Sequence, residues 1–445
     1  MDISRHVRGI MRDDPRLLIE AEQKFAQLRM ERGFHHDGRP YPVSLEPLLI
    51  DQSHAVAAQK AAEDLHRVLE HVADLYRMDE TVRKFMRRYR NAEPWLCMEP
   101  SVKPYVGVCR FDGVIIDGTY RVMETNTCCP GGVIKVPAQF PLWRTVITTV
   151  LGGPALESGE QPFIANPTLF VQHLLQMYRR QFNDTPLSAA IVNLNGRYTN
   201  EVNLMTAGLE EFGVAVRVVD ATCVRRAAEG GIRVDDLKIG LTYNKLDQLE
   251  LISTPECFDY LEAAAAGELC FQNSLMAQLI LEDKAVLALM SDPTFSDMFD
   301  TNDNEVIRRH VPWTRLMTPG RTTSPECEPV ELAKFVIELR DRLVLKPRNL
   351  TRGEGILIGP KTSRKVWENT VGMAIRNGSH VVQEYLPLPS IDLVGGNPPH
   401  LRQMSHELDT YLFDGRFVGF MCRASLDPIV NVGRGGTMVP VVVTE

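Results

Sequence analysis

The stretch from Leu343 to Ile356 consists of an apolar run, a loop with two glycines and the start of a second apolar run. The first run delivers Lys346, and Pro347 ends it, because proline has no amide hydrogen to continue a strand ladder. The lysine supplies a positive charge, while Gly353 and Gly355 let backbone amides come close to an anion. The order predicts two strands joined by a loop suited to a polyphosphate. The stretch does not have the Walker form, in which the lysine opens a helix. An ordinary hairpin without a ligand is the alternative interpretation.

Composition and charge limit the classes of protein to which the chain can belong. It has 445 residues, 44% hydrophobic and 24% charged, which is ordinary globular usage and predicts several packed units. The formal net charge is -8 without blocks of like charge, so nucleic acid and anionic membranes are poor partners. No apolar run is long enough for a membrane span, and the polar start does not resemble a signal peptide. These features predict a cytoplasmic protein.

The nine cysteines are scattered and form no CxxC pair. Only Cys128 and Cys129 are neighbours, and adjacent cysteines are poorly placed to chelate one metal ion. The odd number and the spacing predict reduced thiols in a cytosolic protein. A reactive role for Cys128 or Cys129 is the minority interpretation.

Residue patterns change three times along the chain, which predicts four regions. Residues 1–100 have helical periodicity, including a long amphipathic pattern from Ala55 to Tyr76. Residues 101–185 contain short strands, residues 186–270 alternate strands with helices, and residues 271–445 mix both. Alternating strands and helices predict a parallel sheet in the third region. The fold class is therefore α/β, with α+β character where strands form hairpins.

Several local signals add detail to these regions. Asp117-Gly118 and Asp414-Gly415 each separate two apolar runs and predict hairpin turns. A segment rich in glycine and proline, Gly152 to Pro167, predicts a linker. A helix is expected from Leu279 to Met290, and it would carry Glu282-Asp-Lys284.

A metal-binding pair and a second lysine add to the first stretch. Glu124 and Asn126 lie two apart on an expected strand, so both side chains point to one face. Their carboxylate and amide oxygens are hard ligands suited to Mg²⁺, with an exposed strand acid as the alternative. Lys284 can converge with Lys346 on one triphosphate, where a charge pair at ~4 Å contributes about 4 kcal/mol at an effective dielectric of ~20. Two surface lysines are the competing interpretation.

Further segments are typical of a nucleotide or substrate site. Gln383-Glu384-Tyr385-Leu386 ends an apolar strand, and its backbone groups are suited to reading adenine. Arg423 lies on a late strand, where an inward arginine can clamp a phosphate or carboxylate, and Asn431 precedes a glycine-rich turn. Arg110 with Asp112 is a second such candidate, with a surface salt bridge as the alternative.

In this order the motifs resemble the circularly permuted ATP-grasp ligases, the group that contains eukaryotic glutathione synthetase and glutathionylspermidine-synthase-like proteins. The resemblance spans Arg110 to the C-terminus and rests on the order and spacing of the motifs. They are Arg110-Phe-Asp112, Glu124-Thr-Asn126 with Pro130-Gly-Gly132, Glu282-Asp-Lys284, Val344-Leu-Lys-Pro347, Val382-Gln-Glu384, and Arg423 with Asn431 and the Gly433–Gly436 turn. The resemblance implies an ATP-grasp fold with residues 186–270 as a substrate-side domain. The early position of the Glu-x-Asn pair matches the permuted group.

The resemblance also implies an activity and a role for each motif. The protein would join a carboxylate to an amine with ATP and Mg²⁺, through an acylphosphate, and release ADP. The metal would be held by Glu124 and Asn126. The nucleotide would be held by Lys284, Lys346, the loop with Gly353 and Gly355, the Gln383–Leu386 segment and Asn431. The substrates would be contacted by Arg110, Asp112, Asn200 and Glu201, and Arg423 would face the phosphoryl group or a substrate.

One position departs from the family pattern. Relatives carry an acid four residues after the strand lysine that completes the metal site, and here that residue is Leu350. Asn349 or Glu354 is the expected substitute. A thiol or carrier-protein acceptor and a non-catalytic nucleotide-binding regulator are the alternative functions. The expected substrates are small amino-acid-like or peptide-like acids with an amine, and a homodimer is expected because it fits relatives.

Overall fold

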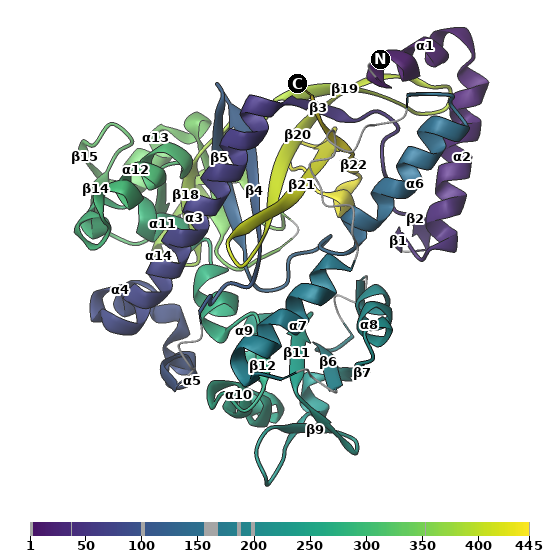
Figure 1. The fold of residues 1–445 in the computed structure, drawn as a ribbon. Helices are drawn as coiled ribbons and strands as arrows, with labels where there is room; N and C mark the ends of the chain where they lie inside the picture. Colours follow the sequence, from purple (N-terminus) through teal and green to yellow (C-terminus); the bar gives the residue numbers. More distant parts are fainter. Residues whose placement is uncertain are drawn as a thin grey trace.

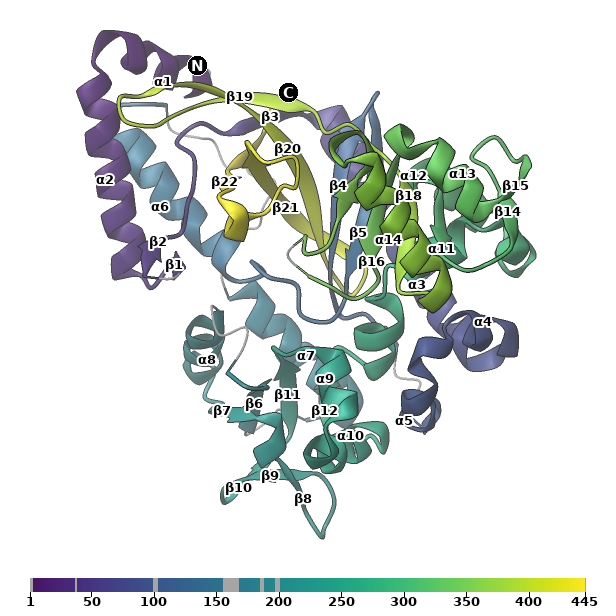
Figure 2. The same cartoon turned by 180° about the vertical axis from the view of Figure 1, so that it is seen from behind.

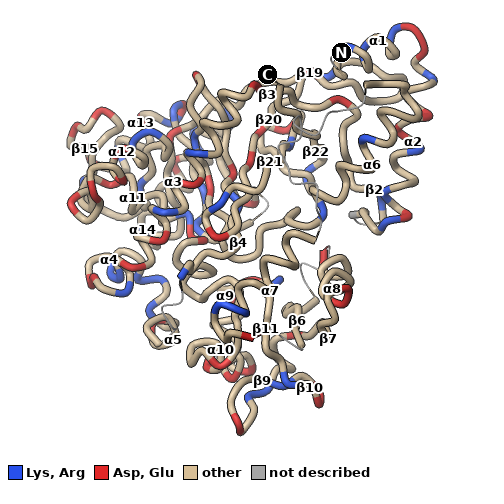
Figure 3. Tube along the Cα trace, in the orientation of Figure 1, with Lys and Arg blue, Asp and Glu red and all other residues tan. Residues whose placement is uncertain are grey.

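The computed structural model describes residues 3–36, 38–98, 103–154, 168–184, 188–196, 201–351 and 353–444. A central sheet stands in the middle of the molecule, a smaller sheet with its helices lies on one side, and a parallel-sheet domain lies below (Figure 1). Lys, Arg, Asp and Glu are interspersed along the trace (Figure 3). Within the ranges given above, none of the helices is both long and apolar enough to cross a bilayer.

The central sheet joins strands from the two halves of the chain. β4 (Val108–Ile116) pairs with β5 (Thr119–Asn126) as a hairpin and with β20 (His400–Phe413) on its other side. β20 continues to β21 (Arg416–Ser425) and β22 (Thr437–Val439), so the order is β22-β21-β20-β4-β5. β19, which spans Ser390–Gly395, pairs with the first residues of β20. All of these pairs are antiparallel.

The two Asp-Gly pairs form the hairpin turns of this sheet, as predicted. Asp117 and Gly118 have φ values of 49° and 72°, and Asp414 and Gly415 have values of 49° and 74°. Two successive positive φ values define the tight turn that matches strand twist, and aspartate and glycine tolerate this conformation better than other residues. Local turn chemistry therefore fixes both hairpins.

The two faces of the central sheet have different partners. One face packs on α3 (Gln52–Met78), which runs across the sheet, and contributes Cys109, Phe111, Leu412 and Cys422 to the largest core cluster. Side chains alternate between faces along a strand, so the residues between these apolar positions point to the opposite face. That opposite face carries the charged residues of the candidate site.

The second sheet carries the lysine of the first motif. Its order is β13-β18-β16-β17, with all pairs antiparallel. The strands are β13 (Thr314–Leu316), β16 (Leu343–Pro347), β17 (Leu357–Ile358) and β18 (His380–Glu384). α13 (Leu332–Glu338) and α14 (Arg364–Asn377) cover it, with Trp367 fully buried in their shared core. The prediction of two strands flanking a glycine loop is confirmed.

The third sheet is parallel, as the alternation of strands and helices predicted. Its order is β12-β11-β6-β7. The strands are β6 (Ser188–Asn193), β7 (Ala215–Asp220), β11 (Leu241–Asn244) and β12 (Cys270–Gln272). The helices around it include α7 (Leu169–Phe182), α8 (Val202–Glu211) and α10 (Phe258–Ala265).

The N-terminal helices contribute to two separate cores. α1 (Ile3–Asp13) and α2 (Pro15–Glu31) pack with α6 (Lys135–Thr149) around Trp143, on the side of the molecule away from the second sheet (Figure 2). α3 packs instead on the central sheet. The helices predicted for residues 1–100 are confirmed, and they share cores with later parts of the chain.

Two features of the chain differ from the sequence predictions. The helix expected from Leu279 to Met290 is divided into a π-helical turn, Ala277–Leu281, and α11 (Ala285–Ser291). Glu282, Asp283 and Lys284 lie at the break, where Asp283 Oδ1 accepts from the Ala285 amide at 2.8 Å. α6 was not predicted, because it contains Pro141 in its interior. The predicted Gly152–Pro167 linker lies almost entirely outside the described residues.

Candidate active site

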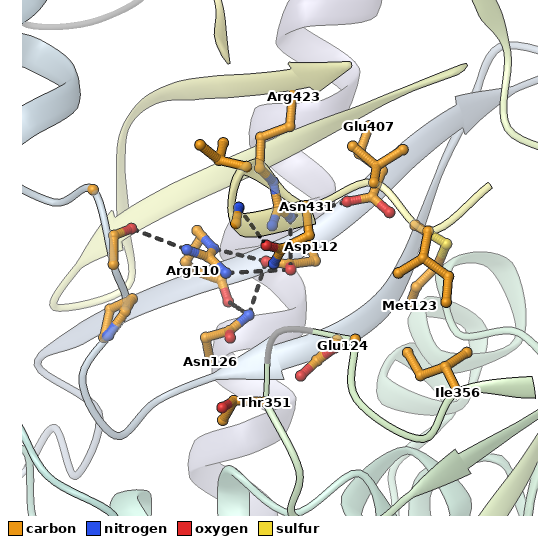
Figure 4. Close-up of a pocket in the computed structure, with 18 of the residues that line it drawn as sticks. Arg110, Asp112, Met123, Glu124, Asn126, Thr351, Ile356, Glu407, Arg423 and Asn431 are labelled. Carbon is orange, nitrogen blue, oxygen red and sulfur yellow. Dashed lines mark hydrogen bonds and ion pairs between the residues drawn. The ribbon is translucent and has the colours of Figure 1, made fainter. Parts of the chain in front are cut away.

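One cavity of about 360 Å³ collects residues from all three sheet regions. The predicted site residues that line it are Arg110, Asp112, Glu124, Asn126, Glu201, Lys346, Gly353, Gln383, Glu384, Tyr385, Leu386, Arg423 and Asn431. Lys284, Asn349, Glu354 and Gly355 are not among the lining residues, and Asn200 lies outside the described residues. Residues that are far apart in the sequence therefore meet at one concave surface (Figure 4).

The Glu-x-Asn pair faces the cavity from β5. Across the hairpin, Asp112 is the register partner of Glu124, and Arg110 is the partner of Asn126. The Asn126 amide nitrogen donates to Asp112 Oδ1 at 2.8 Å and to the Arg110 carbonyl at 3.3 Å (Figure 4). These two acceptors fix the nitrogen, which leaves the amide oxygen of Asn126 as the atom available to a ligand.

Arg423 lies at the centre of a buried ionic network on the same face. Its Nη2 is 2.7 Å from Asp112 Oδ2, 2.9 Å from Glu407 Oε2 and 2.9 Å from Asp409 Oδ2. Arg110 adds a two-point contact to Asp112, through Nε at 2.7 Å and Nη2 at 3.2 Å. The three carboxylates lie within 4.8 Å of one another, a spacing that suits a metal ion, but the Arg423 guanidinium already supplies a cation there.

The network carries one more carboxylate than guanidinium groups. Burial raises the pKa of Glu407 and of Asp409 above the usual carboxyl range, and the neighbouring acids add to the effect. Burial would also raise the pKa of Asp112, but Arg110 and Arg423 outweigh it and hold that pKa below its usual value. Asp112 is therefore the carboxylate that stays ionised between the two arginines.

Both predicted lysines approach the Glu-x-Asn strand. Lys284 Nζ lies 3.0 Å from Glu124 Oε1 and donates to the Leu350 carbonyl at 2.9 Å, so it stands directly behind a lining residue. Lys346 lines the cavity, and its Nζ donates to Gln383 Oε1 at 2.7 Å and to the Met123 carbonyl at 3.1 Å. Burial lowers the pKa of Lys346, whereas Glu124 overcomes burial and raises that of Lys284.

The end of β18 forms another part of the wall. Gln383, Glu384, Tyr385 and Leu386 all line the cavity, and Glu384 pairs with Arg121 at 3.3 Å. The Tyr385 amide donates to the Arg342 carbonyl at 2.8 Å, so this strand end is held in an extended position. It lies beside Lys346 because β16 and β18 are paired strands.

Glu201 belongs to a second charged group at the other end of the cavity. Its carboxylate accepts from the backbone amides of Gly132 and Lys135, at 2.9 and 3.1 Å, and lies 3.3 Å from Lys245 Nζ. Burial would raise the pKa of Glu201, but Lys245 and Lys135 outweigh it and lower the value. Lys135 also lies 4.7 Å from the Tyr41 ring centroid. At this end of the cavity, the positive charges of Lys135 and Lys245 therefore surround the single carboxylate of Glu201.

The glycine loop turns several predicted residues away from the cavity. Asn349 Nδ2 donates to the Tyr89 hydroxyl at 2.5 Å, so its amide is directed to an N-terminal helix segment and does not join the cavity lining with Glu124. Leu350 is 48% exposed. Gly353 and Gly355 adopt φ values of 71° and 70°, and only Gly353 of the two reaches the lining. Asn431 lines the opposite wall and accepts from the Gly433 amide at 2.8 Å.

Several lining residues were missed by the sequence analysis. Glu407 lines the cavity, and Asp409 lies behind it two residues further along β20; this period of two, shared with Glu124 and Asn126, was an available signal. Tyr41, Lys135 and Lys245 lie in segments without a recognisable pattern, so only the fold brings them to the cavity.

Comparison with solved structures identifies the fold. A glutathione synthetase-like effector from Globodera pallida, solved in its apo form, superposes with a TM-score of 0.61 at 14% identity, over 97% of this chain and 98% of that one. A structure from Methylobacillus flagellatus named as a gamma-glutamylcysteine synthetase gives 0.43 at 13% identity, over 88% and 89%. D-cycloserine synthetase gives 0.28 at 12% identity, over 57% and 72%.

The last two TM-scores are too low to define a fold, so the identification rests on the first. No protein-family profile matches the sequence, and no curated protein matches it. The agreement with the effector covers nearly the full length of both chains. The chain therefore has the glutathione synthetase-like ATP-grasp fold that its motif order predicts, with early and late strands side by side in one sheet.

Proposed function

We propose that this protein is an ATP-dependent ligase that joins a carboxylate to an amine and releases ADP and phosphate. The observation that carries the proposal is the common cavity. It is lined by an acid and amide pair, a strand lysine, two arginines and a strand end, drawn from the early and late parts of the chain. Phosphoryl transfer depends on positioning and electrostatic stabilisation, which these residue types supply.

Magnesium would be held by Glu124 and Asn126. The fit is good, because Asn126 presents its oxygen to the cavity while its nitrogen is held by Asp112, and because carboxylate and amide oxygens are hard ligands. A bound Mg²⁺ supplies positive charge to the phosphate oxygens. Glu124 is already ion-paired with Lys284, so the lysine would orient this carboxylate before the metal arrives.

The nucleotide would lie along the wall formed by the second sheet. Lys346 would neutralise phosphate oxygens from the cavity lining and Lys284 from directly behind it, where it pairs with Glu124. Gly353, Gly355 and Asn431 would lie at the loops that flank them. The segment from Gln383 to Leu386 would contact adenine through its backbone groups. Within the described part of the chain, the buried Lys346 donates to two neutral oxygens, so its charge is available to an anion.

The acyl transfer would take place near the arginine network. An oxygen of the substrate carboxylate attacks the terminal phosphorus of ATP, the bond to ADP breaks, and an acylphosphate forms. The amine then attacks the acyl carbon, phosphate leaves, and the amine loses a proton. Arg423 and Arg110 would stabilise the negative charge that develops in both steps, while Asp112 holds the two guanidinium groups in place. Glu201 would contact a substrate at the other end of the cavity.

A screen for ADP release with pairs of small acids and amines tests the proposal. ADP is expected only when both substrates are present, and thiol acceptors are included to separate the amide reaction from thioester formation. Lys346→Ala should abolish turnover, because it removes a phosphate contact, whereas the exposed Lys361→Ala should retain it. Near-normal turnover by a folded Lys346→Ala protein would rule out the proposed site.

A nucleotide-binding protein without catalysis is the second candidate. It is favoured by Leu350, which stands where relatives carry a metal-binding acid, and by Asn349, which binds Tyr89 and does not line the cavity. Calorimetry decides between the two functions. Magnesium-dependent ATP binding without ADP release on any substrate pair would favour this second candidate.

A further inference from the structure

Two adjacent thiols form part of the cavity wall directly after β5. Cys129 is partly exposed and Cys128 is buried, and both line the cavity. Their Sγ atoms lie 4.0 and 3.9 Å from the same carbonyl oxygen, that of Leu246, and Cys128 Sγ also lies 3.7 Å from Gln278 Oε1. The Cys128 amide donates to Glu282 at 2.8 Å, which fixes the backbone of the pair. Cys129 is therefore held in a defined position in the cavity wall.

The surroundings of Cys129 favour its thiolate and attract anions. Lys245 and Lys135 are both buried at this end of the cavity, where Glu201 is the carboxylate between them. Arg110 Nη1 donates to the Gly131 carbonyl at 2.9 Å beside the same loop, and its charge is paired with Asp112. The neighbouring Cys128 side chain lowers the pKa of Cys129, and Lys245 lowers it further, although burial acts in the opposite direction.

The other cysteines lack this combination. Burial raises the pKa of Cys109, Cys257, Cys270 and Cys422, which are enclosed in the cores. Cys97, Cys223 and Cys327 are exposed and do not line the cavity. Among the cysteines of the chain, all of which are described, Cys129 alone joins access to the cavity with a lowered pKa and a neighbouring lysine.

We propose that Cys129 is a thiol-modification site at which an anionic small-molecule disulfide is captured inside the ligand cavity. The Cys129 thiolate attacks one sulfur of the disulfide, whose S–S bond breaks as a new S–S bond to Cys129 forms. The displaced thiolate leaves and takes up a proton from water. Cys129 is oxidised and one half of the reagent is reduced, so no further oxidant is needed. The adjacent Cys128 thiol and the ammonium group of Lys245 favour the ionised form of the attacking sulfur.

The captured group would occupy the end of the cavity that carries Lys135 and Lys245. Modification would therefore exclude an acid substrate and switch turnover off until a thiol reductant removes the adduct. This regulatory consequence rests on the proposed ligase function, whereas the modification itself does not.

Charge selectivity provides the sharpest test of the site. The experiment uses the full chain carrying Cys97→Ser, Cys223→Ser and Cys327→Ser, which removes the exposed thiols. Two probes are compared without nucleotide: dithiobis-nitrobenzoate, a dianionic disulfide, and cystamine, a dicationic one. Intact mass and peptide mapping measure the rate and the position of each adduct. One adduct on Cys129 is expected, forming on the order of tenfold faster with the anionic probe, because the protein's net charge alone favours the cationic one.

Matched variants assign the effect to this pair of residues. Cys128→Ala should slow modification several-fold, while Cys128→Ser, which keeps a hydroxyl donor, should retain most of the rate. Circular dichroism confirms that each variant is folded, and peptide mapping of the parent places the adduct even if a variant fails to fold. An unmodified Cys129 in folded protein, or equal rates with the two probes, would overturn the proposal. Since no nucleotide is present, these results are independent of whether the ligase activity exists.

Discussion

The two walls that face each other across the cavity are built in different ways. On the central sheet, Arg110, Asp112 and Arg423 are held by mutual ion pairs before any ligand arrives. On the loop that follows β16, Asn349 points to Tyr89 and Leu350 is exposed. Strands fix side-chain direction through their pleat, whereas a loop follows whichever contacts are available. The sheet wall is preorganised, and the loop wall presents backbone and small residues.

Removal of Arg423 should have the largest effect on the preorganised wall of the central sheet. Arg423→Leu leaves Asp112, Glu407 and Asp409 without their shared cation, and the free energy of unfolding should fall by about 3–5 kcal/mol. Urea unfolding measures the loss. The exposed Arg416→Leu on the same strand is the control and should change stability by no more than about 0.5 kcal/mol. Equal effects of the two variants would show that the sheet wall is not an electrostatic unit.

Glu282 provides a pH-dependent test. Burial raises the pKa of Glu282 to about 8, so the folded state binds a proton that the unfolded state has already lost. Stability contributed at low pH is therefore lost as the pH rises from about 4.5 to about 8, with a change on the order of 4–5 kcal/mol. Glu282→Gln should flatten this part of the profile while keeping an acceptor for the Thr127 and Cys128 amides. Thermal unfolding at pH 5 and pH 8 measures the difference, and parallel curves for both proteins would contradict it.

Gly353 tests the loop wall. Its φ of 71° is strained for any other residue, and a Cβ would lie 2.5 Å from Ile429 Cγ2. Gly353→Ala should cost about 1 kcal/mol of stability and should weaken nucleotide binding. Gly372→Ala, in the helix α14, should instead stabilise by about 0.5–1 kcal/mol, because it meets only ordinary contacts there. Calorimetric titration with ATP and Mg²⁺, together with urea unfolding, separates the two effects.

Leu350→Glu is expected to change stability least and to raise the affinity for a metal ion. Since Leu350 is exposed, the free energy of unfolding should stay within about 0.5 kcal/mol of the parent. An added acid on the loop should raise affinity for Mn²⁺ several-fold, as measured by electron paramagnetic resonance titration. Val366→Glu, which adds the same charge to the exposed face of α14, is the control. No difference between the variants would mean that the loop does not approach the Glu-x-Asn pair.

The sequence predicts those parts of the molecule that depend on neighbours along the chain. The Asp117-Gly118 turn follows from the φ preferences of two residues, and the shared face of Glu124 and Asn126 follows from strand geometry. The parallel sheet follows from the alternation of strands and helices. These features require no knowledge of distant contacts.

Features that depend on contacts between residues far apart in the sequence could not be predicted. The helix expected through Glu282 is broken where Asp283 binds Arg348, a residue on the far loop, at 2.6 Å. Asn349 appeared suited to a metal until the fold placed the Tyr89 hydroxyl beside it. The contribution of Glu407 to the charged network becomes visible only when β20 pairs with β4 in the folded sheet. In each case a tertiary contact decides which of several local options is taken.

The order of strands in the central sheet also has a consequence for synthesis on the ribosome. The β4–β5 hairpin ends at Asn126, but its partner β20 begins only at His400. At about 5–20 residues per second, the hairpin waits for tens of seconds before its neighbour emerges. A lone two-stranded hairpin is marginal in water, so its apolar face depends on α3 during that interval. The wall of the cavity on the central sheet can therefore assemble only after most of the polypeptide has been made.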